Sequence, residues 1–168
     1  MSCASDAPPI QPIPTQSPAV QAALLALNNA NARETSFLTE EDWRTLIAGS
    51  FAATCAAGAA ALLIALDQDA DYRSVNFKWF QARRWRFVYV DRIVVSGRNR
   101  GQGLAARLYR DLFERARAAG HDRIVCEVNL DPPNPGSDAF HARMGFAEVG
   151  RAELQPGGKT VRYWEKLL

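Results

Sequence analysis

The chain has 168 residues, of which 48% are apolar and 23% are charged, and this balance predicts one globular domain large enough to bury a core. No apolar run approaches the roughly 20 residues that span a bilayer, and the N-terminus lacks the basic and apolar regions of a secretion signal, so we expect neither membrane insertion nor export. The net charge is only +2, and three cysteines, an odd number without metal-ligand spacing, indicate a cytoplasmic protein without a metal site.

The N-terminal part of the chain predicts a tail, an edge strand and a helix. Residues 1–9 are rich in Ser, Ala and Pro and are expected to be disordered, which leaves residues 10–168 as a single domain. Residues 10–15 could form a short edge strand, although two prolines in it cannot donate ladder hydrogen bonds. Ser17 and Pro18 then match the N-cap and first-turn positions of a helix.

A second helix, a hairpin and a long connection follow. Thr39 precedes three acidic residues and a helical apolar pattern, which predicts the start of the second helix. Residues 51–56 and 60–66 flank Gly58 and predict a β-hairpin, although their alanine content would also permit a helix. Residues 67–86 are expected to form a long connection whose many aromatic side chains could line a ligand pocket or simply attach the segment to the domain.

The most informative feature is a glycine-rich turn between a strand and a helix. The apolar run 87–95 is followed by Arg100-Gly101-Gln102-Gly103-Leu104-Ala105, and apolar residues then recur at helical spacing until Gly120. The N-terminus of a helix exposes unpaired N–H groups at a positive dipole end, where phosphate groups bind. A further strand over residues 123–129 completes a β-turn-α-β unit with parallel strands. The turn therefore predicts a site for a phosphate-bearing cofactor.

Two motifs in this order resemble the GNAT N-acetyltransferase superfamily. Arg100-x-x-Gly103-x-Ala105, after a strand that ends in Ile-Val-Val, is similar to the acetyl-CoA-binding motif of that family. The run Asn134-x-x-Ser137-x-Ala139-Phe140-His141-x-x-x-Gly145-Phe146 resembles its next motif. The resemblance covers residues 85–167. Other segments, such as Cys126-Glu127-Val128-Asn129, are similar to a bacterial subgroup of predicted acetyltransferases within the same superfamily.

The resemblance implies an α/β (α+β) fold with a mixed, mostly antiparallel sheet of six to seven strands and about four flanking helices, and acetyl-CoA as the cofactor. It also implies that the two parallel strands splay apart to admit pantetheine, so that backbone N–H groups near Val94 and Val95 polarise the thioester carbonyl. The residues expected to contact the cofactor are Ile93, Val94, Val95, Arg98, Arg100, Gly101, Gln102, Gly103, Leu104, Ala105, Asn134, Ser137 and Phe140.

Two carboxylates are candidates for the general base. An amine must lose its ammonium proton before it can attack a thioester. Asp91 is predicted to share one face of its strand with Tyr89 and Ile93, and the resemblance places the base at this position, four residues before the last valine of the strand. Asp91 could equally pair with Arg92. Glu127, on the neighbouring strand, is the alternate base or an acceptor-binding acid.

His141 occupies a position where GNAT-like enzymes commonly have a Tyr that protonates the coenzyme thiol. Histidine can donate a proton near neutral pH, so the role could survive the substitution. His141 could equally be a packed or solvent-facing side chain, with water as the proton source. As contacts of the acceptor substrate we select Tyr72, Asn76, Trp79, Tyr89 and Asn129.

Two other functions fit parts of the sequence. Gly101-x-Gly103-x-x-Ala106 satisfies a relaxed dinucleotide fingerprint with Glu127 about twenty residues beyond it, but fewer than seventy residues follow, too few for a doubly wound domain. Residues 73–117 contain twelve basic and three acidic residues, a stripe that could attract nucleic acid. A polyanionic cofactor explains this stripe, and no RNA-binding aromatic motif or zinc-finger spacing accompanies it.

The sequence therefore predicts an acetyl-CoA-dependent N-acetyltransferase that acts on a primary amine of a small molecule or peptide by direct attack, without a covalent intermediate. A non-catalytic acyl-CoA-binding sensor and, with less support, a dinucleotide-dependent oxidoreductase are the alternatives. We expect no nucleic-acid or membrane partner. A terminal hairpin, over residues 147–153 and 160–167, would suit a homodimer or a closed acceptor site. No residue set identifies the acceptor amine.

Overall fold

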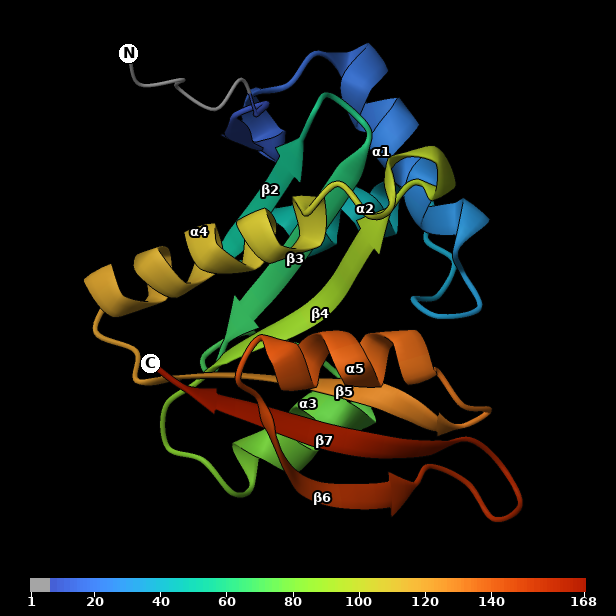
Figure 1. The fold of residues 1–168 in the computed structure, drawn as a ribbon, viewed down its shortest axis with the longest axis vertical. Coiled ribbons are helices and arrows are strands. Elements are labelled where there is room, and N and C mark those ends of the chain that lie inside the picture. Colours follow the sequence, from blue (N-terminus) through green and yellow to red (C-terminus); the bar gives the residue numbers. More distant parts are fainter. Residues whose placement is uncertain (1–6) are drawn as a thin grey trace.

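The computed structural model describes residues 7–168 and contains one seven-stranded sheet in the order β1-β2-β3-β4-β5-β7-β6 (Figure 1). Strands β4 and β5 run parallel, and the other neighbouring strands run antiparallel. The strands are β1 (Ile10–Pro12), β2 (Ala52–Ala56), β3 (Ala61–Asp67), β4 (Val88–Val95), β5 (Arg123–Asp131), β6 (Ala147–Glu153) and β7 (Thr160–Leu167). The helices are α1 (Pro18–Ala30), α2 (Glu40–Ala48), α3 (Val75–Gln81), α4 (Leu104–Ala118) and α5 (Pro135–Arg143). The predicted mixed, mostly antiparallel fold is confirmed.

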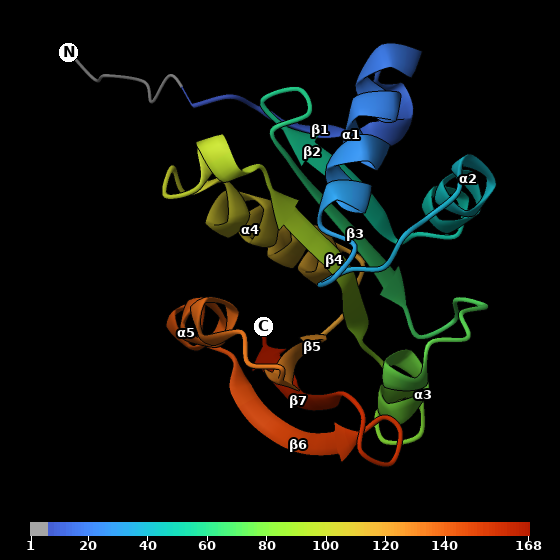
Figure 2. The same ribbon diagram turned by 90° about the vertical axis from the view of Figure 1, so that its right-hand side faces the viewer.

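Helices cover both faces of the sheet and divide the apolar interior into two cores. One core packs the sheet against α4, with α5 beside it, and the other packs the sheet against α1, α2 and α3 (Figure 2). Among residues 7–168, no helix is both long and apolar enough to cross a membrane. Most of the expected disordered tail, and Cys3 with it, falls in residues 1–6, outside the part of the chain that the structure describes.

The predicted starts of the first two helices are confirmed by their caps. The Ser17 hydroxyl accepts a hydrogen bond from the backbone N–H of Val20 at the start of α1. Thr39 and Asp42 form a reciprocal capping box at the start of α2. The segment predicted as an edge strand pairs with β2 only at residues 10–12 and then turns into a short 3₁₀ helix, since its prolines cannot extend the ladder.

The alanine-rich segment after α2 forms the predicted hairpin rather than a helix. Strands β2 and β3 pair antiparallel along their length. Every residue of β2 is buried, as are all but the last of β3. A strand buried on both faces has no polar side to alternate with its apolar side, which explains why period-two alternation is absent here.

The expectation of an irregular connection over residues 67–86 is wrong in its middle, where α3 forms. The Ser74 hydroxyl accepts from the N–H of Phe77 and caps the helix, and Phe77 and Phe80, three residues apart, are both fully buried. With only seven residues, α3 is too short to show a helical period. With α3, the described residues contain five α-helices, where about four were expected.

Trp79 of α3 attaches this helix to the C-terminal hairpin. Its ring stacks on Tyr163 with centroids 4.0 Å apart and planes 19° apart, and the Arg83 guanidinium lies over it at 4.2 Å. A Cβ added to Gly150 of β6 would lie 2.6 Å from the Trp79 ring. Trp79 therefore packs between helix and sheet.

Substituting Gly150 with Ala should destabilise the fold by about 1–3 kcal/mol, because the added methyl overlaps the indole and forces it off its stacked position. The free energy of unfolding in urea measures this loss. Gly97→Ala is the matched control, because a Cβ there meets nothing within 4 Å. Equal stability of the two variants would show that the Trp79 contact is not tight.

Candidate active site

The sheet opens between its two parallel strands. Strands β4 and β5 pair at only two positions, the second of which joins Tyr89 to Val125, although β4 continues to Val95 and β5 to Asp131. Beyond Tyr89 the two strands diverge, so the edge of β4 facing β5 has no strand partner there. The splay implied by the family resemblance is present, and the site is built around it.

The glycine turn at the start of α4 has the geometry of an anion cradle. Gly101 and Gly103 have positive φ angles of 76° and 74°, which favour glycine, and a Cβ at either position would meet nothing within 4 Å. Gly103 is the N-cap, and no side-chain hydrogen bond caps the helix. The first N–H groups of α4 are thus free to bind ligand oxygens, which fits the diphosphate of a coenzyme.

A groove leads from this turn along the end of β4 to α5. It has a volume of about 440 Å³ and is continuous in its lining with a smaller hollow over the turn. Asn134, whose side chain caps α5 by accepting from the Ser137 N–H at 3.3 Å, stands at its far end. All but two of the predicted cofactor contacts line the groove or the hollow. The two that do not are Arg98 and Gln102.

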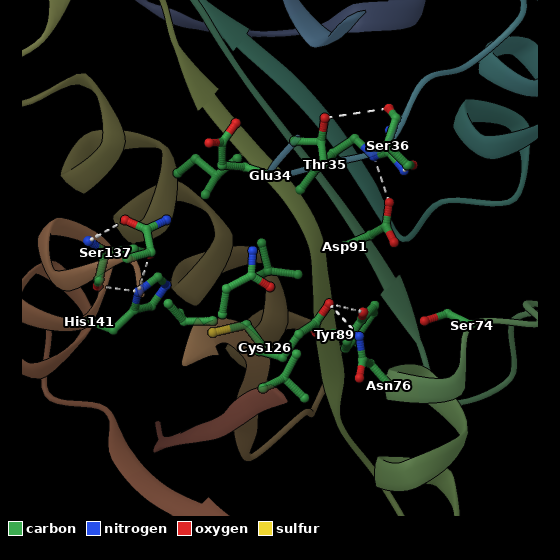
Figure 3. Close-up of a pocket in the computed structure, with 18 of the residues that line it drawn as sticks. Glu34, Thr35, Ser36, Ser74, Asn76, Tyr89, Asp91, Cys126, Ser137 and His141 are labelled. Atoms are coloured by element: carbon green, nitrogen blue, oxygen red, sulfur yellow. Dashed lines mark hydrogen bonds and ion pairs between the residues drawn. The ribbon is translucent and has the colours of Figure 1, made fainter. Parts of the chain in front are cut away.

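A second cavity of about 320 Å³ meets the groove at the splay (Figure 3). Six residues line both spaces. They come from α5 and its N-cap, from the loop between α1 and α2 and from β4, and they are Glu34, Thr35, Ile93, Asn134, Ser137 and His141. Four of the five predicted acceptor contacts line the second cavity. They are Tyr72, Asn76, Tyr89 and Asn129. Trp79 is absent from this lining because it is packed against Tyr163.

Glu127 of β5 lines this cavity, and its two carboxylate oxygens differ in their partners. Its Oε1 accepts hydrogen bonds from the Tyr89 hydroxyl at 2.9 Å and the Asn76 amide at 3.0 Å, and Asn76 in turn accepts from the Tyr163 hydroxyl. Its Oε2 is buried and has no hydrogen-bond partner among the described residues. Burial raises the pKa of Glu127 to about 7, against the opposing effect of the Tyr89 hydrogen bond.

Asp91, in contrast, has both oxygens engaged. Oδ1 accepts from the Tyr72 hydroxyl at 2.6 Å, and Oδ2 accepts from Nε of Arg92 at 2.6 Å. The side chains of Asp91 and Arg92 are only 5% and 2% exposed. The pairing with Arg92, one of the two alternatives for Asp91, is therefore present.

The predicted alternation along β4 is wrong because a bulge interrupts the strand. Ile64 of β3 pairs with Arg92 and Ala65 pairs with Val90, so Asp91 has no pairing residue on β3. Tyr89 packs in the core of α1, α2 and α3, whereas Ile93 packs in the core of α4. The extra residue moves the side chains after it to the opposite faces.

His141 is buried and forms a pair with Tyr109. Its Nδ1 lies 2.8 Å from the Ser137 carbonyl oxygen, which can only accept, so Nδ1 carries the proton. Its Nε2 then accepts from the Tyr109 hydroxyl at 2.8 Å. The side chain is 3% exposed, and burial lowers its pKa. His141 is thus a neutral hydrogen-bond acceptor at the junction of the groove and the cavity.

Sequence reasoning missed two groups of residues at the site. Tyr109 lies among the buried residues of α4, where the sequence pattern predicts a core side chain. Its hydrogen bond to His141 is visible only in the structure. The loop between α1 and α2 contributes Glu34, Thr35 and Ser36 to the cavity. The positive φ of 116° at Ser36 cannot be read from the sequence.

Comparisons with known proteins agree with this geometry. A phosphinothricin N-acetyltransferase from Streptomyces coelicolor is 35% identical over 65 residues, which cover 39% of this chain and only 36% of that protein. A chain of the NatC complex bound to Gag peptide and CoA has a similar fold, with a TM-score of 0.74 and 15% identity over 95% of this chain and 98% of that one. An aminoglycoside 6'-N-acetyltransferase complexed with coenzyme A gives a TM-score of 0.70, with 13% identity over 95% and 96% of the two chains.

The sequence model described as the acetyltransferase (GNAT) family matches residues 30–146. This segment contains the glycine turn, the splayed strands and α5. Since the match spans well over half of the 168 residues, the protein belongs to the GNAT acetyltransferase family.

Proposed function

We propose that the protein transfers an acetyl group to a primary amine of a small molecule, with Glu127 as the general base and without a covalent intermediate. The observation that carries this proposal is the buried, unpartnered Oε2 of Glu127 in the wall of the cavity that meets the cofactor groove. When bound, acetyl-CoA supplies the activated acetyl thioester, and the N–H groups after Gly103 hold its diphosphate.

Glu127 is suited to accept the proton that an ammonium group loses. Its Oε1 is held by two donors, which orients the carboxylate, while Oε2 has no hydrogen-bond partner among the described residues. A base with a pKa of about 7 is half ionised at neutral pH and still basic enough to take a proton from an attacking amine. The titratable or charged side chains near it are Tyr89, Asp91, Arg92, Tyr109, Cys126 and Tyr163. The charge of Asp91, although it is paired with Arg92, adds to the effect of burial in raising the pKa of Glu127.

The walls of the cavity support a small acceptor. The loop between α1 and α2 contributes three residues to it, and the β6–β7 connection contributes Leu154 and Lys159. A volume of about 320 Å³ is at the lower end of the range for small-molecule sites. Two of the similar proteins above are named after small acceptor molecules, phosphinothricin and aminoglycosides. The NatC complex, in contrast, was solved with a bound peptide.

His141 and Tyr109 position the reacting groups at the junction, in this proposal, rather than titrating with the reaction. The Nδ1 proton is committed to the Ser137 carbonyl, so His141 could protonate a thiolate only after taking up a second proton, which its burial opposes. The proton for the departing thiolate therefore comes from water that enters the cavity.

His141→Phe should lower kcat about tenfold, because the Tyr109 hydroxyl loses its acceptor at the junction. The acidic limb of the pH–rate profile, with its midpoint near 7, should remain. Tyr109→Phe removes the other half of the same hydrogen bond and should give a similar loss. If the natural protein also loses activity at alkaline pH, and this alkaline limb disappears in His141→Phe alone, His141 is instead the general acid.

A panel of primary amines, assayed with acetyl-CoA for release of the coenzyme thiol, tests the proposed activity. The panel includes amino acids, polyamines, aminoglycosides and short peptides. We expect amine-dependent thiol release with a small molecule and little with peptides, because a cavity of about 320 Å³ is at the lower end of the range for small-molecule sites. Faster release with peptides would contradict the proposed acceptor class, and absence of release with every amine would contradict the activity.

A further inference from the structure

The loop between α1 and α2 forms a wall of the acceptor cavity and is held in an unusual conformation. Ser36 has a positive φ of 116°, a region that non-glycine residues rarely occupy and that surrounding contacts must maintain. Its carbonyl oxygen accepts from the side-chain amide of Asn28 at 3.0 Å. The N–H and C=O groups of Leu38 both bond to the Asn29 side chain. Two asparagines near the end of α1 thus hold the C-terminal part of this loop.

Arg92 connects this loop to β4. Its guanidinium donates to Oδ1 of Asn28 at 2.9 Å and lies 3.5 Å from the Ser36 hydroxyl. The remaining Nε donates to Asp91 at 2.6 Å. Asn28 is fully buried and Arg92 is 2% exposed, so these contacts are shielded from water. The guanidinium therefore reaches from the bulge of β4 to the residue that holds Ser36.

Asp91 is what allows Arg92 to be there. A guanidinium removed from water needs a paired charge, because an uncompensated buried cation is strongly destabilising. The bulge places Asp91 outside the β3–β4 ladder, where its carboxylate can turn toward Arg92 and Tyr72. A carboxylate with both oxygens occupied is poorly placed to accept a proton from substrate.

We propose that Asp91 and Arg92 are positioning residues that lock the loop between α1 and α2 as a wall of the acceptor cavity and so determine the affinity for the acceptor. The predicted effect on acceptor affinity rests on the proposed function. The predicted effect on the order of the loop rests on the contacts that join Asp91, Arg92, Asn28 and Ser36.

Two variants break the chain at different points. Asp91→Asn removes the charge that neutralises Arg92. Asn28→Ala removes the hydrogen bonds through which Asn28 joins Arg92 to the Ser36 carbonyl, without touching Asp91, and leaves only the 3.5 Å contact of Arg92 with the Ser36 hydroxyl. Asp111→Asn is the matched control, because Asp111 forms an aspartate–arginine pair with Arg115 on the surface of α4, away from the loop. The double variant Asp91→Asn with Arg92→Gln replaces the charged pair by a neutral one, should Asp91→Asn alone not fold.

Hydrogen exchange and steady-state kinetics provide the readouts. The N–H groups of Thr35, Ser36 and Leu38 are hydrogen-bonded within the loop or to Asn29 and report its order directly. In both Asp91→Asn and Asn28→Ala, we expect these amides to exchange at least about tenfold faster and KM for the acceptor to rise about tenfold, with kcat changed less than about threefold. The affinity for CoA should stay as in the Asp111→Asn control in both variants. The midpoint of the pH profile should also stay in Asn28→Ala, whereas Asp91→Asn should lower it, because the Asp91 charge helps to raise the pKa of Glu127.

Loss of kcat in Asp91→Asn together with loss of the pH-dependent limb, with unchanged loop exchange, would make Asp91 the base and overturn the inference. A protein that acetylates no amine would refute the proposed function instead. In that case loop exchange alone decides: faster exchange in both variants supports the lock, and unchanged exchange refutes it.

Discussion

Glu127→Gln should lower kcat about a thousandfold, within the range that a positioned general base contributes. The amide keeps an oxygen for the Tyr89 and Asn76 hydrogen bonds but cannot take a proton from the attacking ammonium. Affinity for CoA, measured by calorimetry, should be unchanged because Glu127 does not line the cofactor groove. Glu165→Gln is a useful comparison, since Glu165 is paired with Arg84 and Arg123 outside the cavity. Loss of kcat below about tenfold in Glu127→Gln would contradict its role as the base.

The same variant has a consequence for stability that does not depend on activity. The pKa of Glu127 in the folded protein, about 7, is raised above its ordinary value of 4.5. Stability from the neutral carboxyl is therefore fully present below pH 4.5 and is lost as pH rises through 7. We expect Glu127→Gln to be more stable than the natural protein at pH 8 and about equally stable at pH 4, as measured by urea unfolding. A Glu127→Gln variant that is less stable than the natural protein at pH 8 would show that the buried carboxylate does not destabilise the fold.

Gly103→Asp should weaken CoA binding by at least about 30-fold, because a like charge next to bound phosphate costs several kcal/mol. A Cβ at this position points into open space, so the side chain would occupy the cradle without a clash inside the protein. Aspartate tolerates positive φ better than most residues and is favoured at an N-cap, so the helix should form. Calorimetric titration with CoA measures the loss.

Gly103→Asn separates charge from bulk in this experiment. Asparagine has nearly the same size and the same tolerance of positive φ, so it should weaken CoA binding less than aspartate does. The difference between the two variants should shrink as salt concentration rises. Equal affinities of the natural protein and Gly103→Asp would refute the glycine turn as the diphosphate site.

Much of the fold could be predicted because its signals are local. Ser17 and Thr39 cap helices in a way that the sequence displays, and the glycine turn between a strand and a helix predicts the parallel β4–α4–β5 unit that the structure contains. Helix α3 was missed because seven residues with buried aromatics carry no periodic signal. The bulge at Asp91 was missed because it depends on how β4 pairs with β3, which is a tertiary property.

The site could be predicted in its cofactor half and only in part elsewhere. The cofactor motif is contiguous, and the match to the GNAT family sets aside the dinucleotide reading of the same glycines. The acceptor half assembles from α3, β4, β5, β7 and the loop after α1, so its hydrogen bonds join residues up to 87 positions apart, as between Tyr163 and Asn76. The choice between Asp91 and Glu127 depends on which oxygen has a partner, and only the folded protein contains that information.

The pH dependence of kcat/KM, compared between the natural protein and Glu127→Gln with an amine from the panel, tests the central claim most directly. Protonation of the base inactivates it, so activity of the natural protein should rise with pH through a midpoint of about 7, the pKa to which burial raises Glu127. The residual activity of Glu127→Gln should lack this limb, while Asp91→Asn should keep it. A limb that persists unchanged in Glu127→Gln, or that disappears in Asp91→Asn instead, would contradict the assignment of Glu127 as the base.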